Sequence, residues 1–262
     1  MQKPSVIIPV RFASSRLPGK IMLPLLGKTV LWHVVNRAMK ASLVKKVIIA
    51  TTDSKADDIT EQFCKKYNIP IFRGNELDVL GRYYECAKKF KLKNIVRLTQ
   101  DCPLLDPNII DECISEFIKN DYDYVSNSIE YTYPDGMDTE IFTFEALEKS
   151  AFEAELPSER EHVTGYMRNN QGFKIKNVYS KKNYPIFRLT LDYPEDYELI
   201  KNIYEGIGLD MFFIDDIIDY INLNPELLKL NQHIKPNDGF IKSYEEDRKF
   251  LRARESKSKD LE

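Results

Sequence analysis

Three short apolar runs, rich in β-branched residues, constrain what this sequence can fold into more than any other feature. The runs are Ser5–Val10, Lys46–Ala50 and Asn94–Leu98. Each lacks the polar alternation of a strand with one face in water. Each is therefore predicted to be a strand that is covered on both faces of a sheet.

Segments with a helical spacing of apolar residues lie between these runs. Thr29–Ala41 has its apolar residues on one helical face, and Asp57–Tyr67 and Val79–Phe90 follow the same pattern. Strands that alternate with helices need crossover connections, which are right-handed in a mainly parallel sheet. The sequence therefore predicts an α/β fold with a mainly parallel central sheet.

The rest of the chain continues with mixed elements. Further predicted strands are Tyr122–Ser126, Glu140–Phe144 and Phe187–Leu191, and further predicted helices are Pro107–Asn120, Phe144–Ala154, Pro194–Tyr204 and Ile214–Asn222. No composition break divides the chain, so residues 1–240 are predicted to form one domain. Residues 241–262 are mostly charged and have no apolar period, which predicts a frayed or disordered tail.

Charge and composition exclude several classes of function. The formal net charge of the 262 residues is −3, which gives no electrostatic basis for general nucleic-acid binding. No apolar run approaches the about 20 residues that span a bilayer, and the N-terminus lacks a signal-peptide layout. We therefore expect a cytoplasmic protein with no nucleic-acid or membrane partner. The four cysteines form no Cys-x-x-Cys pair, which favours reduced thiols over a zinc or redox site.

A basic loop, "RFASSRLPGK" at residues 11–20, follows the first predicted strand. In an open parallel sheet, ligands bind beyond the carboxyl ends of the strands. The loop is not a P-loop, because its only glycine is Gly19. Small residues such as Ala13 and Ser14 let backbone N–H groups approach an anion closely. Two interpretations stay open, a phosphate-binding loop and an ordinary turn with exposed cations.

Two carboxylates follow other predicted strands, Asp101 after the third and Asp192 after the late one. Each aspartate alone is more typical of a cap at the start of the following helix. As a pair opposite a basic loop, they suit a nucleoside triphosphate with Mg²⁺, because cations neutralise phosphates and carboxylates bind the metal.

Five stretches together resemble a known family. "VRFASSRLPGK" is similar to the first loop of the cytidylyltransferases that activate sugar acids, the CMP-KDO and acylneuraminate synthetases, and most of all to the spore-coat-polysaccharide branch. The other stretches, in the family's order, are "IFRGNELDVLGRYYECA", "VRLTQDCPLLDP", "YPDGMDTEIF" with "EREHVT", and "LTLDYPEDYELI". They cover most of the chain from residue 5 to about residue 230.

The resemblance implies a Rossmann-like, GT-A-like nucleotidyltransferase fold and a specific reaction. CMP would pass from CTP to a small anionic sugar-type acceptor, a sugar acid or a phosphorylated sugar, with release of pyrophosphate. The product would serve surface polysaccharide or glycan biosynthesis. The resemblance also implies Mg²⁺ as cofactor and a homodimer, with residues 130–185 as the acceptor and dimer region.

The resemblance also implies roles for single residues. The implied catalytic residues are Arg16, Lys20, Asp101 and Asp192, of which the two aspartates are the metal ligands. Nucleotide binding is implied for Arg11, Ala13, Ser14, Arg16, Lys20, Thr52, Arg73, Asp78 and Arg82. Acceptor binding is implied for Asp135, Asp138, Glu140, Glu161, His162 and Arg188. Gly81 departs from the family, whose members often carry an acidic residue at this position.

Two other functions compete with this one. A glycosyltransferase of related fold usually carries an Asp-x-Asp metal motif after a central strand, whereas this chain has Gln100-Asp101-Cys102, with one carboxylate. A non-catalytic nucleotide-binding protein would bind CTP without turnover. Pyrophosphate release from CTP in the presence of an acceptor separates both from a cytidylyltransferase.

Overall fold

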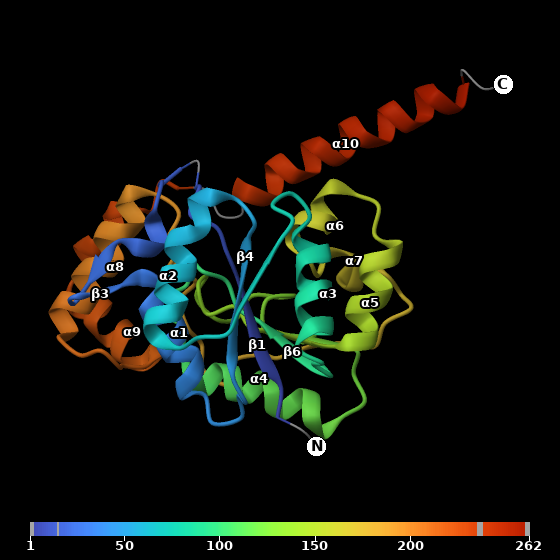
Figure 1. The fold of residues 1–262 in the computed structure, drawn as a ribbon. Coiled ribbons are helices and arrows are strands. Elements are labelled where there is room, and N and C mark those ends of the chain that lie inside the picture. The colour runs from blue at the N-terminus through green and yellow to red at the C-terminus, as the bar shows by residue number, and fades with distance from the viewer. Residues whose placement is uncertain (1–2, 15, 235–237, 260–262) are drawn as a thin grey trace.

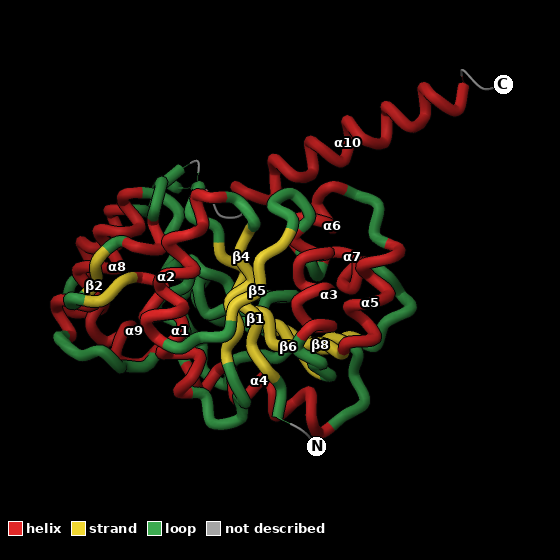
Figure 2. The backbone as a smooth tube through the Cα atoms, in the orientation of Figure 1, coloured by secondary structure: helices red, strands yellow, loops and turns green. Residues whose placement is uncertain are grey.

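The computed structural model describes residues 3–14, 16–234 and 238–259. A mixed sheet with strand order β5-β4-β1-β6-β8-β7-β9 forms its centre, and Figure 2 shows helices on both sides of these strands. β1 pairs in parallel with β4 and β6, β4 pairs in parallel with β5, and β8 is antiparallel to its neighbours β6 and β7. The predicted α/β fold with a mainly parallel sheet is confirmed.

The strands of the described chain are β1 (Ser5–Val10), β2 (Pro24–Leu25), β3 (Lys28–Thr29), β4 (Val47–Thr52), β5 (Ile71–Gly74), β6 (Asn94–Arg97), β7 (Tyr124–Ser126), β8 (Glu140–Thr143) and β9 (Ile175–Asn177). The α-helices are α1 (Val30–Lys40), α2 (Asp58–Tyr67), α3 (Val79–Lys89), α4 (Pro107–Lys119), α5 (Phe144–Glu153), α6 (Pro157–His162), α7 (Gly165–Asn169), α8 (Pro194–Ile207), α9 (Ile214–Leu223) and α10 (Asp238–Lys259). Short 3₁₀ helices are η1 (Lys20–Met22), η2 (Lys55–Asp57) and η3 (Pro225–Leu230).

Two cores, one on each face of the sheet, explain why β1 is apolar from Val6 to Val10. Val6, Ile8 and Val10 belong to the core formed with α1, α2, α4, α8 and α9. Ile7 belongs to the core formed with α3, α5 and α7. Because successive side chains of a strand point to opposite faces, a strand buried on both faces favours apolar residues at every position. Figure 1 shows the two helical layers flanking β1 and β4.

The position of β1 in the sheet determines where a ligand can bind. From β1 the chain runs outward through β4 to β5, and then returns through α3 to β6 on the other side of β1. The strand order therefore reverses between β1 and β6. A crevice opens at the carboxyl ends of the strands at such a point. The loops that meet there are the basic loop 11–20 and the segment that carries Asp101.

Two predictions about secondary structure were wrong. Phe187–Leu191 is not a strand: its only strand-like pairing is a single bridge between Arg188 and Asp135. Backbone bonds from Leu189 and Leu191 to the carbonyls of Asp135 and Asp101 hold it extended at the edge of the crevice. The sequence of this segment correctly predicts extended backbone, but it cannot predict whether a neighbouring strand pairs with it.

The charged tail, predicted to be frayed, forms the helix α10 as far as Lys259, and residues 260–262 lie outside the described residues. Its Glu, Lys and Arg residues are good helix formers. Figure 1 shows α10 starting beside α6 and extending away from the rest of the molecule. The helix depends on contacts with α6, which the sequence does not predict because the tail has no apolar period.

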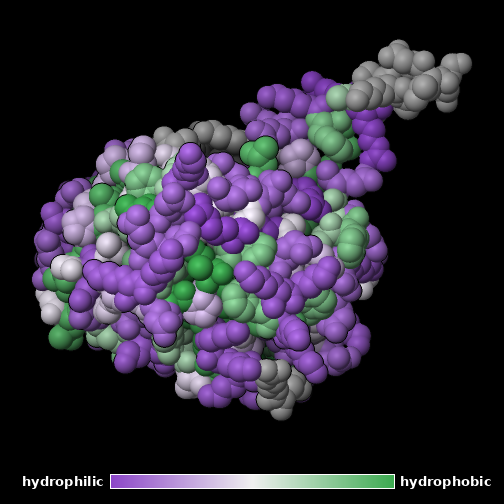
Figure 3. All heavy atoms as spheres, viewed as in Figure 1, coloured by the Kyte–Doolittle hydropathy of each residue, from purple (hydrophilic) through white to green (hydrophobic). Residues whose placement is uncertain are grey.

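None of the described helices is long and apolar enough to cross a bilayer. Figure 3 shows hydrophilic side chains over most of the viewed face, with apolar residues in small groups.

Candidate active site

The loop after β1 folds back on itself through Phe12. The carbonyl of Phe12 accepts hydrogen bonds from the backbone N–H groups of Ser14, at 3.0 Å, and Gly19, at 3.2 Å. Gly19 has φ 68°, and a Cβ there would lie 3.1 Å from the Phe12 ring. This left-handed turn needs glycine, and it leads directly into η1, whose first residue is Lys20.

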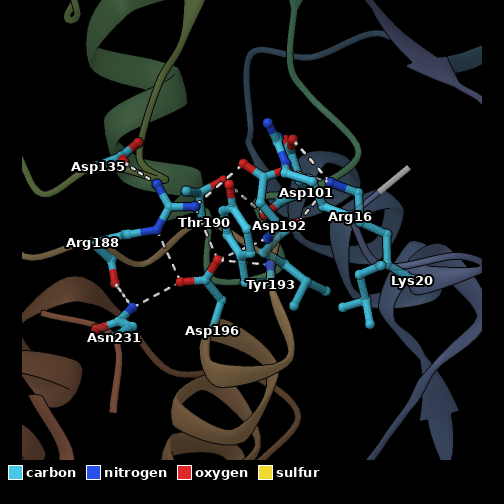
Figure 4. A network of polar contacts seen from close by, with 12 residues as sticks. Arg16, Lys20, Asp101, Asp135, Arg188, Thr190, Asp192, Tyr193, Asp196 and Asn231 are labelled. Carbon is cyan, nitrogen blue, oxygen red and sulfur yellow. Dashed lines mark hydrogen bonds and ion pairs between the residues drawn. The ribbon is translucent and has the colours of Figure 1, made fainter. Parts of the chain in front are cut away.

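Lys20 joins the basic loop to both predicted metal ligands. Its Nζ is 2.8 Å from Asp192 Oδ1, 3.4 Å from Asp101 Oδ2 and 2.7 Å from the carbonyl of Leu191. The side chain is almost fully buried, and Figure 4 shows it from close by among its polar partners. Residues far apart in the sequence, from the segments after β1 and β6 and from the extended segment before α8, therefore meet at one ammonium group.

The charges of this cluster stabilise one another. Burial opposes the charge on Lys20, but Asp101 and Asp192 outweigh burial and raise the pKa of Lys20. Burial alone would raise the pKa of Asp192, yet Lys20 and Arg16 lower it to about 2. Arg16 Nη2 lies 2.7 Å from Asp192 Oδ1, and its guanidinium lies over the Tyr193 ring at 5.3 Å. Lys20 and Asp192 are therefore both charged at neutral pH.

The two aspartates fit a Mg²⁺ ion as a pair. Both carboxylates reach the same ammonium group, so both face one point between the loops. Among the described residues, no group of three or more His, Cys, Asp or Glu side chains surrounds a possible metal position. Mg²⁺ usually takes one or two carboxylates and completes its octahedron with water and substrate phosphates. The donor set therefore suits Mg²⁺ held together with a phosphate-bearing substrate.

A buried aspartate supports the segment that carries Asp192. Asp196 is inaccessible to solvent and accepts two bonds of 2.9 Å from Arg188, and one from the backbone N–H of Asp192. Asn231 donates a further bond to Asp196. Arg188 Nη2 also lies 3.3 Å from Asp192 Oδ2 (Figure 4). This platform fixes the direction in which Asp192 faces the crevice.

Two cavities of about 520 and 530 Å³ adjoin this cluster. We call the cavity beside loop 11–20 the loop cavity and the other the inner cavity. The loop cavity is lined by Arg11, Ser14, Lys20, Gln100, Arg160 and Glu161. The inner cavity is lined by Arg97, Asp135, Asp138, Glu140, Arg168 and Arg188. Arg16, Asp101, His162 and Asp192 line both, so the two cavities meet at the charged cluster.

The structure brings most of the predicted site residues together. The loop cavity is lined by all four predicted catalytic residues and by Arg11 and Ser14. The predicted acceptor residues line the inner cavity, with one exception: Glu161 lines the loop cavity. The predicted nucleotide residues that are absent from the lining of both cavities are Ala13, Thr52, Arg73, Asp78 and Arg82.

Arg73 and Asp78 have partners elsewhere that explain their positions. Arg73 forms ion pairs with Asp58 and Glu61 of α2. Asp78 caps α3 through the backbone N–H of Gly81 and pairs with Arg160, which itself lines the loop cavity. A Cβ on Gly81 would collide with the Asp78 carboxylate.

Sequence reasoning did not assign several residues that line the inner cavity. Arg97 and Arg168 are the main ones, and Arg168 Nη2 donates a 2.8 Å bond to the carbonyl of Ser128. Their sequence neighbourhoods carry no signal, because an arginine on a strand or a short helix is usually solvated. Three residues of α10 also line the cavities: Ser243 and Glu246 the loop cavity, and Tyr244 the inner cavity.

α10 is held against α6 by a pair of hydrogen bonds. Asp247 is buried and accepts bonds from the backbone N–H of Ser158, at 2.9 Å, and from its hydroxyl, at 2.5 Å. Ser243 donates a 2.7 Å bond to Glu161 and lies 2.9 Å from His162 Nε2. The helix therefore closes the cavities on the side of α6.

Replacement of Asp247 by alanine is expected to release α10 from α6. Loss of two charge-assisted bonds of about 1.5–3 kcal/mol should raise the population of the open helix by at least ~10-fold. Trypsin should then cleave α10 at least ~10-fold faster at its basic residues. Glu245→Ala, at an exposed position of the same helix, is the matched control. Equal cleavage of the wild type and Asp247→Ala would show that these bonds do not hold the helix.

Comparisons with known proteins agree with this geometry. The cytidylyltransferase family profile matches residues 5–216. The spore coat polysaccharide biosynthesis protein SpsF of Bacillus subtilis is 33% identical over 231 residues, which are 84% of this chain and 94% of SpsF. The 3-deoxy-manno-octulosonate cytidylyltransferase of Geobacter metallireducens is 34% identical over 116 residues, 44% of this chain and 45% of that protein.

A solved structure extends the likeness to the fold. The structure of a cytidylyltransferase from Leptospira borgpetersenii superposes with a TM-score of 0.84 at 36% identity, and it covers 90% of this chain and 100% of that one. The profile match, the SpsF relative and this structure span the strands, the basic loop and both aspartates. The chain therefore belongs to the cytidylyltransferase family, whose members are CTP-using nucleotidyltransferases.

Proposed function

We propose that this protein transfers CMP from CTP to a small anionic sugar-type acceptor, a sugar acid or a phosphorylated sugar, and releases pyrophosphate. The observation that carries the proposal is the meeting of two cavities at Arg16, Asp101 and Asp192. A triphosphate in the loop cavity and an acceptor in the inner cavity would face each other across this cluster. The name of the SpsF relative favours a product used in polysaccharide biosynthesis.

The transfer needs positioning and charge stabilisation more than covalent chemistry. An acceptor oxygen attacks the α-phosphorus in line while pyrophosphate leaves from the opposite side. Arg11, Arg16 and Lys20 hold the phosphates and take up the negative charge that develops on the leaving group. These residues come from one loop, so the Phe12–Gly19 turn sets their spacing.

Asp101 and Asp192 are the residues that would hold Mg²⁺. When bound, the ion supplies positive charge to the phosphate oxygens and lowers the barrier to their displacement. Arg188 and Asp196 keep Asp192 in its orientation. A homodimer through residues 130–185 stays a prediction.

A panel of nucleotides against a panel of sugar acids and sugar phosphates, read as pyrophosphate release, tests the proposed reaction. We expect release that needs CTP, Mg²⁺ and an anionic acceptor together. Transfer of sugar from a nucleotide sugar, with no pyrophosphate release from CTP, would instead support a glycosyltransferase. CTP binding with no turnover on any acceptor would support a binding protein.

Arg168 supports an anionic acceptor. Its guanidinium lines the inner cavity, and its one hydrogen bond among the described residues goes to an uncharged carbonyl, that of Ser128. A planar guanidinium binds carboxylates and phosphates through two parallel bonds. Arg168 is therefore placed to bind the anionic group of the acceptor.

Replacement of Arg168 by glutamine is expected to raise the KM of the acceptor by ~10–100-fold, the loss of one charge-assisted interaction. The KM of CTP should change little, because Arg168 is absent from the lining of the loop cavity. Steady-state kinetics with each substrate varied in turn measures both constants. Lys174→Gln removes an exposed cation and serves as control. An unchanged acceptor KM in Arg168→Gln would contradict this role.

A further inference from the structure

Three carboxylates of the segment 135–140 line the inner cavity, and they differ in their partners. Glu140 is saturated: it pairs with Arg97 and accepts a 2.6 Å bond from the hydroxyl of Tyr124. Asp135 faces Arg188 across 3.7 Å. Asp138 has no hydrogen bond or ion pair with any residue that the structure describes. It is the carboxylate of this cavity that is available to a substrate.

The backbone around Asp138 is held rigidly. Asn127 is buried and donates a 2.9 Å bond to the carbonyl of Met137, and it accepts a 2.8 Å bond from the N–H of Thr139. Gly136 has φ 104°, and a Cβ there would lie 2.7 Å from the backbone of Leu189. Both residues next to Asp138 are therefore anchored, and its side chain is presented to the cavity from a fixed position.

The surroundings of Asp138 favour its proton. Burial raises the pKa of Asp138 to about 8, with help from the like charges of Asp135 and Glu140 and against Arg97 and Arg168. The other titratable groups that interact with it are Cys102 after β6, Cys113 on α4 and Tyr131. A carboxylate with this proton affinity takes a proton from a weak acid far better than an ordinary aspartate does.

We propose that Asp138 is the general base of the transfer: it takes the proton of an acceptor hydroxyl as that oxygen attacks the α-phosphorus of CTP. The inference rests on the proposed function. The new bond joins the acceptor oxygen to the α-phosphorus, and the bond from this phosphorus to the oxygen bridging to the β-phosphorus breaks. Its electron pair leaves with pyrophosphate, and the acceptor proton moves to the Asp138 carboxylate.

This role narrows the class of acceptor. A phosphate oxygen is already ionised at neutral pH and needs no base, whereas a sugar hydroxyl must lose its proton as it attacks. Arg168 in the same cavity suits an anionic group on the same molecule. The geometry therefore points to an acceptor with a nucleophilic hydroxyl and a separate anionic group, which is the pattern of a sugar acid.

The pH dependence of turnover tests the proposal. For the wild type, kcat/KM for a hydroxyl acceptor should rise about tenfold per pH unit and level off above about pH 8, because only the ionised carboxylate acts as base. The kcat of Asp138→Asn should be ~100-fold or more below that of the wild type, and its kcat/KM should no longer rise with pH. The KM of CTP should stay the same. Asp138→Glu should recover part of the rate and the limb.

Asp135→Asn gives an independent readout. Removal of the neighbouring charge should move the midpoint of the rising limb to lower pH, whatever happens to the absolute rate. A limb that persists in Asp138→Asn, or a midpoint that does not move in Asp135→Asn, overturns the role of Asp138. Absence of any wild-type pyrophosphate release across the acceptor panel overturns the proposed function itself. CTP binding by calorimetry verifies that each variant is folded.

Discussion

The Asp101→Asn variant is expected to release pyrophosphate at least ~100-fold more slowly than the wild type and to keep its fold, since loss of one preorganised charge in such a site costs this much. The change removes the negative charge at the carboxyl end of β6 without removing volume. An amide is a poor ligand for Mg²⁺ beside a carboxylate. The charged cluster would then hold one metal-binding aspartate instead of two.

We expect the fold to survive this change because the shorter bonds that tie Asp101 to the rest of the molecule are those of its main chain, whereas its carboxylate lies 3.4 Å from Lys20. The carbonyl of Asp101 accepts a 2.8 Å bond from the N–H of Leu191 and a 3.3 Å bond from the hydroxyl of Thr190. Lys20 keeps its 2.8 Å contact with Asp192. We expect the free energy of unfolding to change by less than about 1 kcal/mol, the usual range for partly exposed ion pairs.

Pyrophosphate release at saturating CTP, acceptor and Mg²⁺ measures the effect, and thermal unfolding checks the fold. Asp53→Asn is the matched control, because Asp53 follows β4, is exposed and is absent from the lining of both cavities. Turnover of Asp101→Asn within a few-fold of the wild type, with the same Mg²⁺ dependence, would rule out the metal role of Asp101.

The parts of the fold that sequence reasoning found are those whose signal is local. β1 and α4 have apolar residues at the period of their own element, so each predicts itself. Phe187–Leu191 has the same apolar character as a strand, but a strand exists only where a neighbour pairs with it. The short helices α6 and α7 lie in a polar stretch, "SEREHVTGYMRNN", where capping and tertiary contacts outweigh the hydrophobic pattern.

The residues of the site likewise divide into those that the sequence pattern indicates and those that tertiary packing alone brings there. The meeting of Asp101 with the basic loop was predictable because strand ends in a parallel sheet converge on one edge, whatever the side chains are. Asp192 reaches the same place through an extended segment that is no strand and that bonds to the backbone of Asp135 and Asp101. Arg168 was not predictable, because its place in the inner cavity depends on the packing of α7 against the segment after β7. Arg73 forms ion pairs with Asp58 and Glu61 of α2 and is absent from the lining of both cavities, so its predicted role in nucleotide binding stays a prediction.

The Lys20→Met variant is expected to lose both CTP affinity and turnover. Methionine keeps most of the length of lysine in a position that is 4% exposed, but it removes the charge that Asp101 and Asp192 share. The carbonyl of Leu191 also loses its 2.7 Å donor. With the cation gone, two carboxylates repel both each other and the incoming triphosphate.

We expect the Kd of CTP to rise by ~10–100-fold, which corresponds to one charge-assisted bond of about 1.5–3 kcal/mol. Turnover should fall by a further ~100-fold, because the charge on leaving pyrophosphate loses a fixed cation. Calorimetry with CTP and pyrophosphate release separate the two effects, and Lys55→Met, at an exposed position on η2, controls for the loss of a positive charge. A variant that binds CTP normally but turns over slowly would show that Lys20 does not bind the phosphates and acts only through Asp101 and Asp192. Loss of a residue that binds the phosphates must raise the Kd of CTP.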